Sequence, residues 1–516
     1  MQRTDVSAFV AEAAEEVPER QALVESDGRS LTWAELEDEV ARIATGLGAQ
    51  GIRAGQRVMI VVGNRLEFVT AYLGVLRAQV VAVPVNPRSV SGEVARMIAD
   101  SGTRLVVVDE SALDVVRAAV AELEDAPAPR LAVVGAEPAA GEMSFAALRA
   151  DVVRPVPPLP DPEKLAALLY TSGTSSLPRA AMLSHRALLA NLEQVAAVEP
   201  PMMHGDDVVL GVIPLFHVYG LNAVLGGVLR HRARLLLVER FDPQAVLDLI
   251  DDEACSVVPI VPAVFPQWLP DEHLKERLGP VRLVISGSAP LDPAVIDEFT
   301  AITAIPVHQG YGLTEASPVV TSTLCSVALQ SGSVGAALPG IEIRLVDETY
   351  RLIETEDPGE IQIRGANLFS GYWPDGAGGP DADGWYGTGD VGFLDASGDL
   401  FLVDRVKELV IVSGFNVYPS EVEEVLREVE GVTDAAVIGT PDPDSGEAVV
   451  AYVIAPGADR AALEEAVREH CGVRLARFKQ PTRIQVVEQL PLTVTGKVQK
   501  GQLRQLERRR VLGLLE

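Results

Sequence analysis

The sequence predicts an α/β protein with a large N-terminal domain of doubly wound, mostly parallel sheets and a small C-terminal α+β domain. Two observations support this class. Apolar, strand-like runs alternate with amphipathic helical runs over most of the chain, and the pattern changes after about residue 404. Apolar strands between helices are typical of parallel sheets buried on both faces. We therefore expect two domains, residues 1–403 and residues 404–516.

Helix signals and apolar runs locate the elements of the first domain. Thr32 and Glu35 can form a capping box, and Gly51 can end the helix that it begins. Helical spacing follows at Leu36, Val40, Ile43 and Leu47. A second helix is expected at residues 67–77. Strands are expected at residues 57–62, 80–85, 105–108, 131–134, 168–171, 235–238 and 283–286.

The C-terminal part has a different texture, with shorter strands and more charge. Strands are expected at residues 406–412, 435–438 and 449–454, and helices at residues 420–430 and 460–471. This pattern predicts a compact α+β unit. Before it, residues 375–384 are rich in Gly, Asp and Pro and are expected to form a surface loop.

Charge excludes some classes of partner. The 516 residues include 43 Lys and Arg against 73 Asp and Glu, a net charge of −30. Such acidity opposes general binding to nucleic acids or anionic membranes. Basic side chains concentrate near the end of the chain, where residues 468–510 carry 11 basic and 3 acidic side chains. A small basic site for an anionic ligand therefore stays open.

Cysteine usage and hydropathy indicate a cytoplasmic protein. Cys255, Cys325 and Cys471 lie far apart and form no disulfide framework or paired metal motif. The first 20 residues lack the apolar core of a signal peptide. No apolar run reaches the ~18 residues of a membrane-spanning helix, so none is expected.

Residues 171–179 (TSGTSSLPR) follow a predicted strand and precede a helical stretch. Their hydroxyls, backbone N–H groups and one cation are the groups that a triphosphate needs. The GxxxxGK[ST] spacing of the common phosphate loop is absent. An ordinary turn rich in Ser and Thr would have the same composition, so both interpretations stay open at this point.

Residues 309–315 (QGYGLTE) combine two glycines with groups suited to a nucleotide. Glycine permits close approach of the backbone to a ligand, and Tyr311 offers a flat face to a base. Thr314 and Glu315 offer a hydroxyl for phosphate and an oxygen ligand for Mg²⁺. The alternative is a glycine-rich turn that carries a buried tyrosine.

Two later segments place a charged side chain in a turn. Residues 386–390 (YGTGD) are followed by residues 404–407 (DRVK), and residues 491–497 read PLTVTGK. Taken singly, Asp390 fits a turn former and Lys497 fits a solvated surface lysine.

Together, in this order, the four segments resemble the adenylate-forming enzymes, which include acyl-CoA synthetases, aryl-CoA ligases, luciferases and peptide-synthetase adenylation domains. The resemblance runs from residues 31–33 (LTW) to about Leu503, and residues 214–220 (PLFHVYG) and 286–290 (SGSAP) share it. It implies two steps. A carboxylate attacks the α-phosphate of ATP to give acyl-AMP and pyrophosphate, and the thiol of CoA then displaces AMP.

The resemblance also implies roles for single residues. ATP contacts fall on Thr171, Ser172, Gly173, Thr174, Ser175, Arg179, Gln309, Gly310, Tyr311, Gly312, Thr314, Asp390 and Arg405. Glu315 would hold Mg²⁺, and Lys497 would bridge carboxylate and phosphate. The catalytic set is Lys497, His217, Thr314 and Glu315.

The same resemblance implies an acyl pocket, a thiol channel and a mobile C-terminal domain. The pocket residues are His217, Val218, Asn222, Val261, Ser286, Gly287, Ser288 and Gly310. The CoA channel residues are His217, Gly414, Phe415 and Asn416. Lys407 would sit at the hinge, and the basic residues 468–510 could receive the phosphates of CoA.

The identity of the acid rests on fewer signals. Phe216, His217 and Val218 lack the aspartate with which amino-acid-activating relatives pair the α-ammonium group, so an amino acid is disfavoured. Apolar residues dominate 221–228, which fits an apolar tail. We expect a medium- or long-chain fatty acid. The alternatives are an aryl acid of the coumarate or benzoate type, and a carrier protein in place of CoA.

The phosphate segment departs from the family pattern TSGTTGxPKG. Ser176 stands at a glycine position, Arg179 at the lysine and Ala180 at the next glycine. Side chains at glycine positions restrict the backbone, and arginine is a planar donor. We expect an active enzyme, with a degenerate nucleotide-binding homologue as the alternative. The oligomeric state stays open, a homodimer included.

Overall fold

The computed structural model describes most of the chain. The described residues are 3–124, 126–171, 178–289, 291–347, 349–353, 357–405, 408–412, 415–442, 446–493 and 496–511. The chain divides into two compact units, Met1–Glu342 with Arg364–Tyr386, and Ile343–Ile363 with Gly387–Glu516. The domain boundary expected between residues 403 and 404 stays a prediction.

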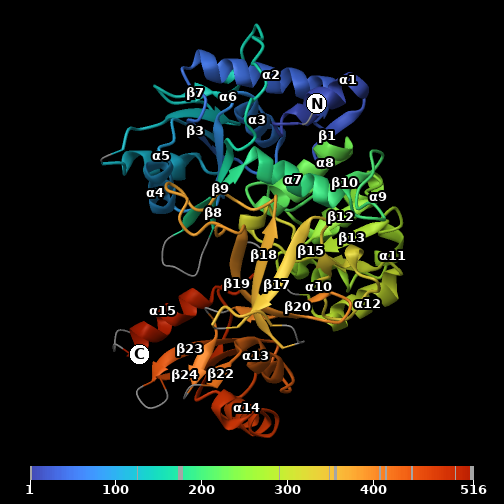
Figure 1. Ribbon diagram of the computed structural model, residues 1–516, viewed down its shortest axis with the longest axis vertical. Helices are drawn as coiled ribbons and strands as arrows, with labels where there is room; N and C mark the ends of the chain where they lie inside the picture. The colour runs from blue at the N-terminus through green and yellow to red at the C-terminus, as the bar shows by residue number, and fades with distance from the viewer. Residues whose placement is uncertain are drawn as a thin grey trace. The chain divides into compact units, whose positions relative to one another are not determined.

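One seven-stranded sheet of the first unit has the order β7-β6-β5-β3-β4-β8-β9 and is parallel except for the pair β8 and β9. Its strands are β3 Arg57–Val61, β4 Val81–Pro84, β5 Leu105–Asp109, β6 Arg130–Val134, β7 Met143–Ser144, β8 Leu165–Thr171 and β9 Arg179–Ser184. Its helices are α2 Trp33–Ala49, α3 Leu66–Arg77, α4 Ser91–Ser101, α5 Leu113–Ala121 and α6 Phe145–Leu148. Helices α4 and α5 cover one face, and α2 and α3 cover the other (Figure 1).

The other seven-stranded sheet of this unit has the order β14-β13-β12-β10-β11-β1-β2 and is parallel except for β1 and β2. Its strands are β1 Gln21–Glu25, β2 Ser30–Thr32, β10 Val208–Gly211, β11 Arg234–Leu237, β12 Val257–Ile260, β13 Leu283–Ser286 and β14 Val307–Gln309. The other helices of the unit are α1 Ala8–Glu16, α7 His185–Ala196, the π-helix η1 Tyr219–Gly226, α8 Gly227–His231, α9 Pro243–Asp252, α10 Phe265–Trp268, α11 Leu274–Arg277 and α12 Pro293–Thr303. Short elements are the 3₁₀ turns η2 Pro262–Val264, η3 Thr314–Ala316 and η4 Thr323–Cys325, and the strands β15 Thr321–Ser322 and β16 Ala336–Ala337.

Local chemistry explains where these elements begin and end. The Thr32 hydroxyl accepts from the Glu35 N–H, and the Glu35 carboxylate accepts from the Thr32 N–H, so the predicted capping box opens α2. Gly51, with φ +77°, follows the helix end. The seven strands expected in the first domain are all present, with bounds shifted by at most three residues. The fold class is thereby confirmed.

Most of the second unit consists of two further sheets. One is antiparallel where β19 meets β20 and contains β17 Ile341–Val346, β18 Gly359–Gly365, β19 Trp385–Leu394 and β20 Leu400–Arg405. The other contains β21 Val410–Val412, β22 Phe415–Val417, β23 Asp434–Asp442, β24 Gly446–Ile454 and β25 Arg483–Val487. Its helices are α13 Pro419–Arg427, α14 Arg460–Arg474, the short η5 Arg477–Lys479 and α15 Lys500–Val511. Apolar residues of α13 and α14 pack on one face of this sheet and Leu503 of α15 on the other.

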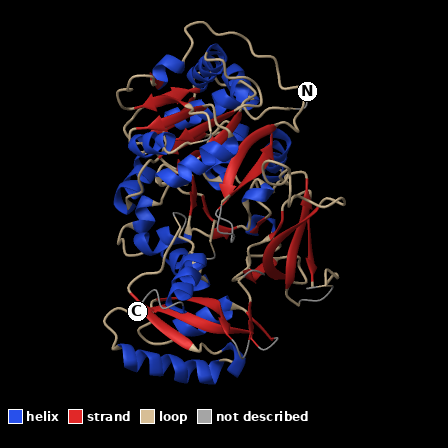
Figure 2. Ribbon diagram, turned by 90° about the vertical axis from the view of Figure 1, so that its left-hand side faces the viewer, coloured by secondary structure: helices blue, strands red, loops and turns tan. Residues whose placement is uncertain are grey.

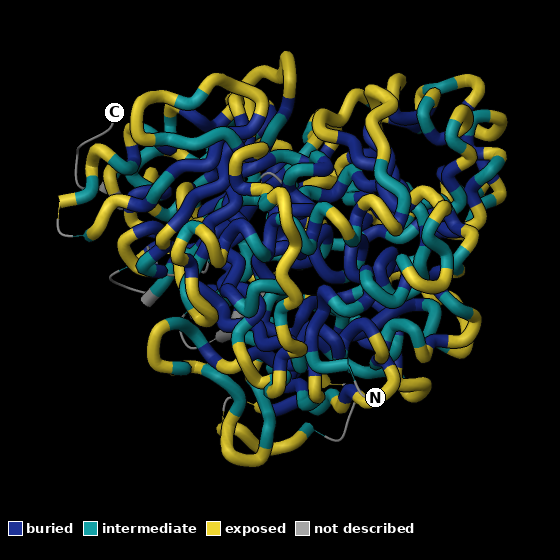
Figure 3. The backbone as a smooth tube through the Cα atoms, turned by 90° about the horizontal axis from the view of Figure 1, so that it is seen from above, coloured by how far each residue is buried: buried dark blue, intermediate teal, exposed yellow. Residues whose placement is uncertain are grey.

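Burial follows these layers. Figure 2 shows the strands flanked by helices, and Figure 3 shows buried backbone in the interior and exposed backbone mostly toward the outside. In the part of the chain that the structure describes, we find no helix with the length and hydropathy needed to cross a membrane.

Candidate active site

Three neighbouring parallel strands bring the predicted acyl residues to one edge of a sheet. Ile260 of β12 lies opposite Ser286 of β13, and Ser286 lies opposite Gln309 of β14. The residues that continue these strands are Val261, Gly287 and Gly310. Carboxyl ends of parallel strands are where open α/β sheets bind ligands. The predicted pocket residues of these strands therefore lie side by side at one edge of the sheet.

A π-helix supplies the next part of this site. His217 and Val218 directly precede η1, and the His217 carbonyl accepts from the Leu221 N–H at 2.8 Å. The buried Asn222 amide donates to the carbonyls of Leu188 (3.1 Å) and Ser317 (2.7 Å). The sequence predicted that Asn222 lines the pocket. In the structure, its amide connects η1 with α7 and with the segment at Ser317. π-helices are rare in proteins, and those that occur often lie at functional sites.

Tyr219, the first residue of this π-helix, lies against the backbone of Gly287. A Cβ added to Gly287 would be 3.3 Å from Cε1 and Cζ of the Tyr219 ring. The next residue, Ser288, has φ +73°, a backbone conformation that costs free energy in a residue other than glycine. Burial raises the pKa of Tyr219 and keeps its hydroxyl protonated. The motif PLFHVYG contains Tyr219, but its role was not predicted, because an aromatic residue in an apolar run usually belongs to the core.

The glycines of residues 309–315 have a reason within the chain. A Cβ at Gly310 would lie 2.7 Å from the Thr321 carbonyl oxygen, and one at Gly312 would lie 2.3 Å from the Pro318 carbonyl oxygen. At both positions, the absence of a side chain therefore lets another backbone segment of the same chain pack closely. The same segments bury Tyr311, whose N–H donates to the Thr321 hydroxyl at 3.1 Å.

The Glu315 carboxylate is buried and held by a tyrosine. The Tyr372 hydroxyl donates to Glu315 Oε1 at 2.6 Å, and the Phe369 N–H donates to the Glu315 carbonyl at 2.9 Å. Burial, with the Glu315 charge, raises the pKa of Tyr372 to about 12, so its hydroxyl remains a donor at neutral pH. Burial and the same carboxylate raise the pKa of Tyr386. Tyr386 begins the predicted segment YGTGD, where it was given no role of its own. Tyr372 was not predicted, and the dipeptide Tyr372-Trp373 between Gly371 and Pro374 is the signal that was available.

Glu315 fits the magnesium site that the sequence predicts. Mg²⁺ is usually held by one or two carboxylates together with phosphate oxygens and water. Among the described residues, no group of three or more His, Cys, Asp or Glu side chains could hold a metal ion. A metal that arrives with a nucleotide needs no such cluster, so the single buried carboxylate is sufficient.

Arg179, from the phosphate segment, begins β9 and contacts Tyr372, the partner of this carboxylate. Its guanidinium carbon lies 3.6 Å from the centre of the Tyr372 ring. The Thr171 hydroxyl at the end of β8 donates to the Arg179 carbonyl at 3.4 Å. The residues between them that were predicted to bind ATP lie outside the described residues: Ser172, Gly173, Thr174 and Ser175. The helix expected after this segment is preceded by β9, which was not predicted.

The second unit carries the remaining predicted residues. Asp390 of β19 lies opposite Arg405 of β20, and its N–H donates to the Thr388 hydroxyl at 3.1 Å. Lys497 has an exposed side chain at a turn in which the Thr493 N–H donates to its carbonyl at 2.7 Å. Lys407 and Gly414 lie outside the described residues, as do the side chains of Arg405, Phe415 and Asn416.

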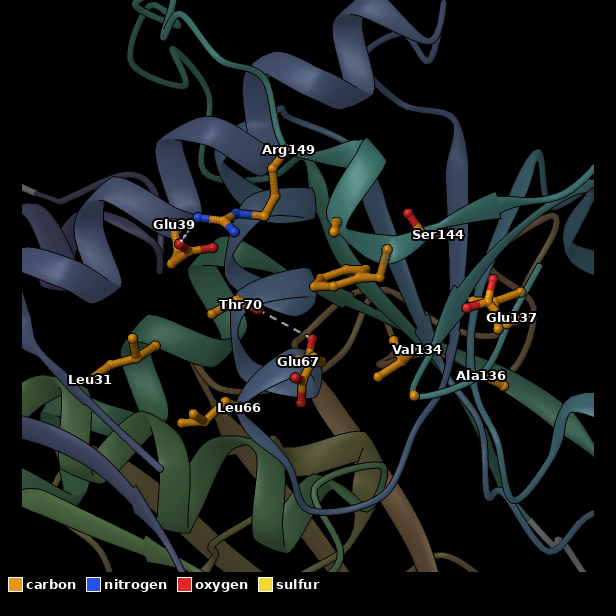
Figure 4. Close-up of a pocket in the computed structure, with 14 residues that line it drawn as sticks. Leu31, Glu39, Leu66, Glu67, Thr70, Val134, Ala136, Glu137, Ser144 and Arg149 are labelled. Atoms are coloured by element: carbon orange, nitrogen blue, oxygen red, sulfur yellow. Dashed lines mark hydrogen bonds and ion pairs between the residues drawn. The ribbon is translucent and has the colours of Figure 1, made fainter. Parts of the chain in front are cut away.

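A hollow of about 570 Å³ lies elsewhere in the first unit (Figure 4). Its lining includes Glu39, Glu67 and Glu137, and its Arg149 is ion-paired with Glu39. None of the predicted site residues lines it. Its carboxylates would repel the phosphates of a nucleotide, which disfavours this hollow as the place of the ATP chemistry.

Comparisons with known proteins agree with this arrangement. Residues 10–373 match the model of the AMP-binding enzymes, and residues 421–497 match that of the AMP-binding enzyme C-terminal domain. The chain is 34% identical to 4-coumarate–CoA ligase-like 9 of Oryza sativa subsp. japonica, covering 97% of this chain and 92% of the relative. It is 30% identical to a long-chain-fatty-acid–CoA ligase of Bacillus subtilis, covering 96% and 94%. ATP-bound MatB from Rhodopseudomonas palustris superposes with a TM-score of 0.88 at 32% identity, covering 98% and 99%.

The fold, the strand-end site and these matches define the class: the chain belongs to the family of AMP-binding, adenylate-forming enzymes. Within the family it stands among the AMP-forming acyl-CoA synthetases, which use ATP, Mg²⁺ and CoA.

Proposed function

We propose that this enzyme joins a carboxylic acid to CoA in two steps. The carboxylate oxygen attacks the α-phosphorus of ATP, and pyrophosphate leaves. The CoA thiolate then attacks the acyl carbon, and AMP leaves with the oxygen that came from the acid. The observation that carries the proposal is the match to acid–CoA ligases over more than nine tenths of this chain, with Glu315 and Lys497 present.

Each residue has a role suited to its chemistry. Arg179 would donate to phosphate oxygens, and Asp390 would accept from the ribose hydroxyls. Glu315 would hold Mg²⁺, which when bound neutralises phosphate charge. Lys497 would bridge the attacking carboxylate and the α-phosphate, two anions whose repulsion must be offset. His217 would lie between the acyl site and the thiol channel.

For the acid, we place a planar aryl acid of the 4-coumarate type first. The Tyr219 ring against Gly287 offers a flat wall at the strand ends, and aromatic rings pack well on such a surface. The names of the relatives agree, because several are named 4-coumarate–CoA ligases. The apolar residues 221–228 do not by themselves indicate a fatty-acid tunnel, since Leu221, Val224, Leu225 and Val228 are buried in the core.

A medium- or long-chain fatty acid is the second candidate, because the Bacillus subtilis relative is named for such a substrate. Purified enzyme with ATP, Mg²⁺ and CoA should be supplied with 4-coumarate, benzoate and a series of fatty acids. Mass spectrometry of the thioesters then decides between the two classes. Acyl-AMP without any thioester would point to a carrier protein as acceptor, and ATP binding without product from any acid would point to a degenerate homologue.

The basic residues near the C-terminus are proposed to receive CoA. Arg474 and Arg477 lie at the end of α14 and in η5, and Arg477 lines a hollow of about 370 Å³ with Phe478. Replacing both arginines by Gln should raise the KM for CoA and leave pyrophosphate release unchanged. An unchanged KM for CoA would mean that these arginines only solvate the surface. Arg460, an exposed arginine at the other end of α14, is the matched control.

We also propose a cytoplasmic protein whose C-terminal domain moves between the two steps. Cys255 and Cys471 are buried, free thiols, which suits a reducing compartment. The domain would move because it carries both Lys497, which serves the first step, and the residues of the thiol channel, which serve the second.

A further inference from the structure

Tyr372 contacts two predicted ATP-site residues at once. Its hydroxyl donates a 2.6 Å hydrogen bond to the Glu315 carboxylate, and the guanidinium of Arg179 lies over its ring at 3.6 Å. Glu315 is 8% exposed, so the tyrosine reaches a carboxylate that water reaches poorly. One side chain therefore connects the predicted ligand of a cation with the predicted ligand of an anion.

The main chain around Tyr372 is fixed. Residues 370–373 run antiparallel to β9, with Ala181 opposite Tyr372. The Phe369 ring packs edge-on against the Tyr372 ring, with 5.1 Å between ring centres. Both the ring and the hydroxyl thus have a defined position before any ligand arrives.

The ring suits an arginine better than a lysine. A guanidinium is planar and can lie flat on an aromatic face, while its N–H groups at the edge still donate to an anion. An ammonium group is a compact, strongly hydrated charge without a flat face. Arg179 stands where the family pattern has lysine, and the Tyr372 ring provides a flat face on which its guanidinium stacks.

We propose that Tyr372 is a positioning residue of the ATP site, which orients Glu315 through its hydroxyl and Arg179 through its ring. In this way it fixes the spacing between the ligand of Mg²⁺ and a donor to the phosphates. The proposal rests on the proposed roles of Glu315 and Arg179. Tyr372 itself acts through these two residues and is not a catalytic residue.

The first test separates the hydroxyl from the ring. Tyr372→Phe removes the donor to Glu315 and keeps the aromatic face. We expect ATP to bind about tenfold more weakly in the presence of Mg²⁺, the effect of losing one hydrogen bond to a charged group. ATP binding in EDTA should be unchanged. Binding is measured by titration calorimetry, and Tyr350→Phe, at a tyrosine that is 74% exposed, is the matched control.

The second test addresses the ring. In the wild-type background, Arg179→Lys should weaken ATP binding in EDTA several-fold, because an ammonium group cannot stack on the Tyr372 ring. In the Tyr372→Leu background, the same exchange should have a much smaller effect, because the aromatic ring is already absent. Equal effects in the two backgrounds would overturn the role of the ring.

Glu315→Gln distinguishes this inference from the function on which it rests. If Glu315→Gln abolishes the effect of Mg²⁺ on ATP binding while Tyr372→Phe changes nothing, the role of the Tyr372 hydroxyl is wrong and that of Glu315 stands. If Glu315→Gln leaves the Mg²⁺ effect intact, the proposed metal ligand is wrong, and the inference falls with it. Melting temperatures within a few degrees of wild type show that the variants compared are folded.

Discussion

Gly287→Ala changes the proposed acyl site by a single methyl group. The new Cβ would lie 3.3 Å from two carbons of the Tyr219 ring and 3.5 Å from its hydroxyl oxygen. These separations are shorter than ordinary contacts between carbon atoms. The ring must therefore shift by a few tenths of an ångström, or the methyl group takes space from the acid. Either change removes space from a flat substrate that packs beside Tyr219.

The size of the effect follows from the volume of one carbon. A methyl or methylene misfit in a shaped pocket costs roughly 1–3 kcal/mol, or about 10- to 200-fold in kcat/KM. We expect kcat/KM for 4-coumarate, or for the best aryl acid, to fall about tenfold or more. The KM for ATP and the rate with acetate should stay unchanged, because neither ligand reaches the Tyr219 ring.

The assay follows pyrophosphate release with each acid at saturating ATP, and with ATP varied to obtain its KM. Gly48→Ala is the matched control, because a Cβ at Gly48 of α2 meets nothing within 4 Å. An equal loss with acetate and with the aryl acid would refute the reasoning, since the methyl group would then be disturbing the reaction centre. An unchanged rate with every acid would show that the acid does not bind beside Gly287.

Three further predictions concern catalysis and stability. Lys497→Ala should slow acyl-AMP formation by about 10²- to 10³-fold, the effect of removing one group that stabilises a transition state; thioester formation from synthetic acyl-AMP should be retained, and a loss of both steps would contradict the role. Gly312→Ala should lower the melting temperature, because its Cβ would meet the Pro318 carbonyl oxygen at 2.3 Å and overpacking costs about 1–3 kcal/mol; an unchanged melting temperature would contradict that contact. Burial lowers the pKa of His185 below its ordinary value of 6.5. As the pH drops below about 6.5, the imidazole therefore takes up a proton in the unfolded chain before it does so in the folded one, and the free energy of unfolding should fall. His185→Gln should make the free energy of unfolding, measured in urea, depend less on pH, and an unchanged pH dependence would assign it to other groups.

Much of the fold could be predicted because local signals and tertiary structure agree. The Thr32 capping box opens α2, and the apolar runs at residues 57–62 and 105–108 became neighbouring parallel strands. In each case, one short segment contains every residue that determines the element. The pattern of apolar residues and the helix cap were therefore sufficient to predict it.

Elements that depend on distant partners could not be predicted. β9 consists of Arg-Ala-Ala-Met-Leu-Ser, which has neither alternation nor strong β propensity. It is a strand because β8 pairs with it on one side and residues 370–373 on the other. The π-helix at Tyr219 is similar, since its Asn222 amide donates to the carbonyls of Leu188 and Ser317, which lie 34 and 95 residues away in the sequence.

The same limit applies to the site. Glu315 was predicted from its motif, but nothing near it in sequence points to Tyr372, which lies 57 residues away. The glycines at 310 and 312 were predicted for a ligand, and the structure shows that their space is taken by residues 318–321 of the same chain. Motifs identify which residues matter, and only the packing shows what holds them.

The central claim is that the acid is activated as an acyl-adenylate, and one isotope measurement tests it most directly. An acid labelled with ¹⁸O in its carboxylate is incubated with the enzyme, ATP, Mg²⁺ and CoA, and the products are analysed by mass spectrometry. Attack on the α-phosphorus predicts one ¹⁸O in AMP and none in pyrophosphate, with the acyl group in the thioester. Label in inorganic phosphate, with ADP as the nucleotide product, would mean an acyl-phosphate route and would contradict the account.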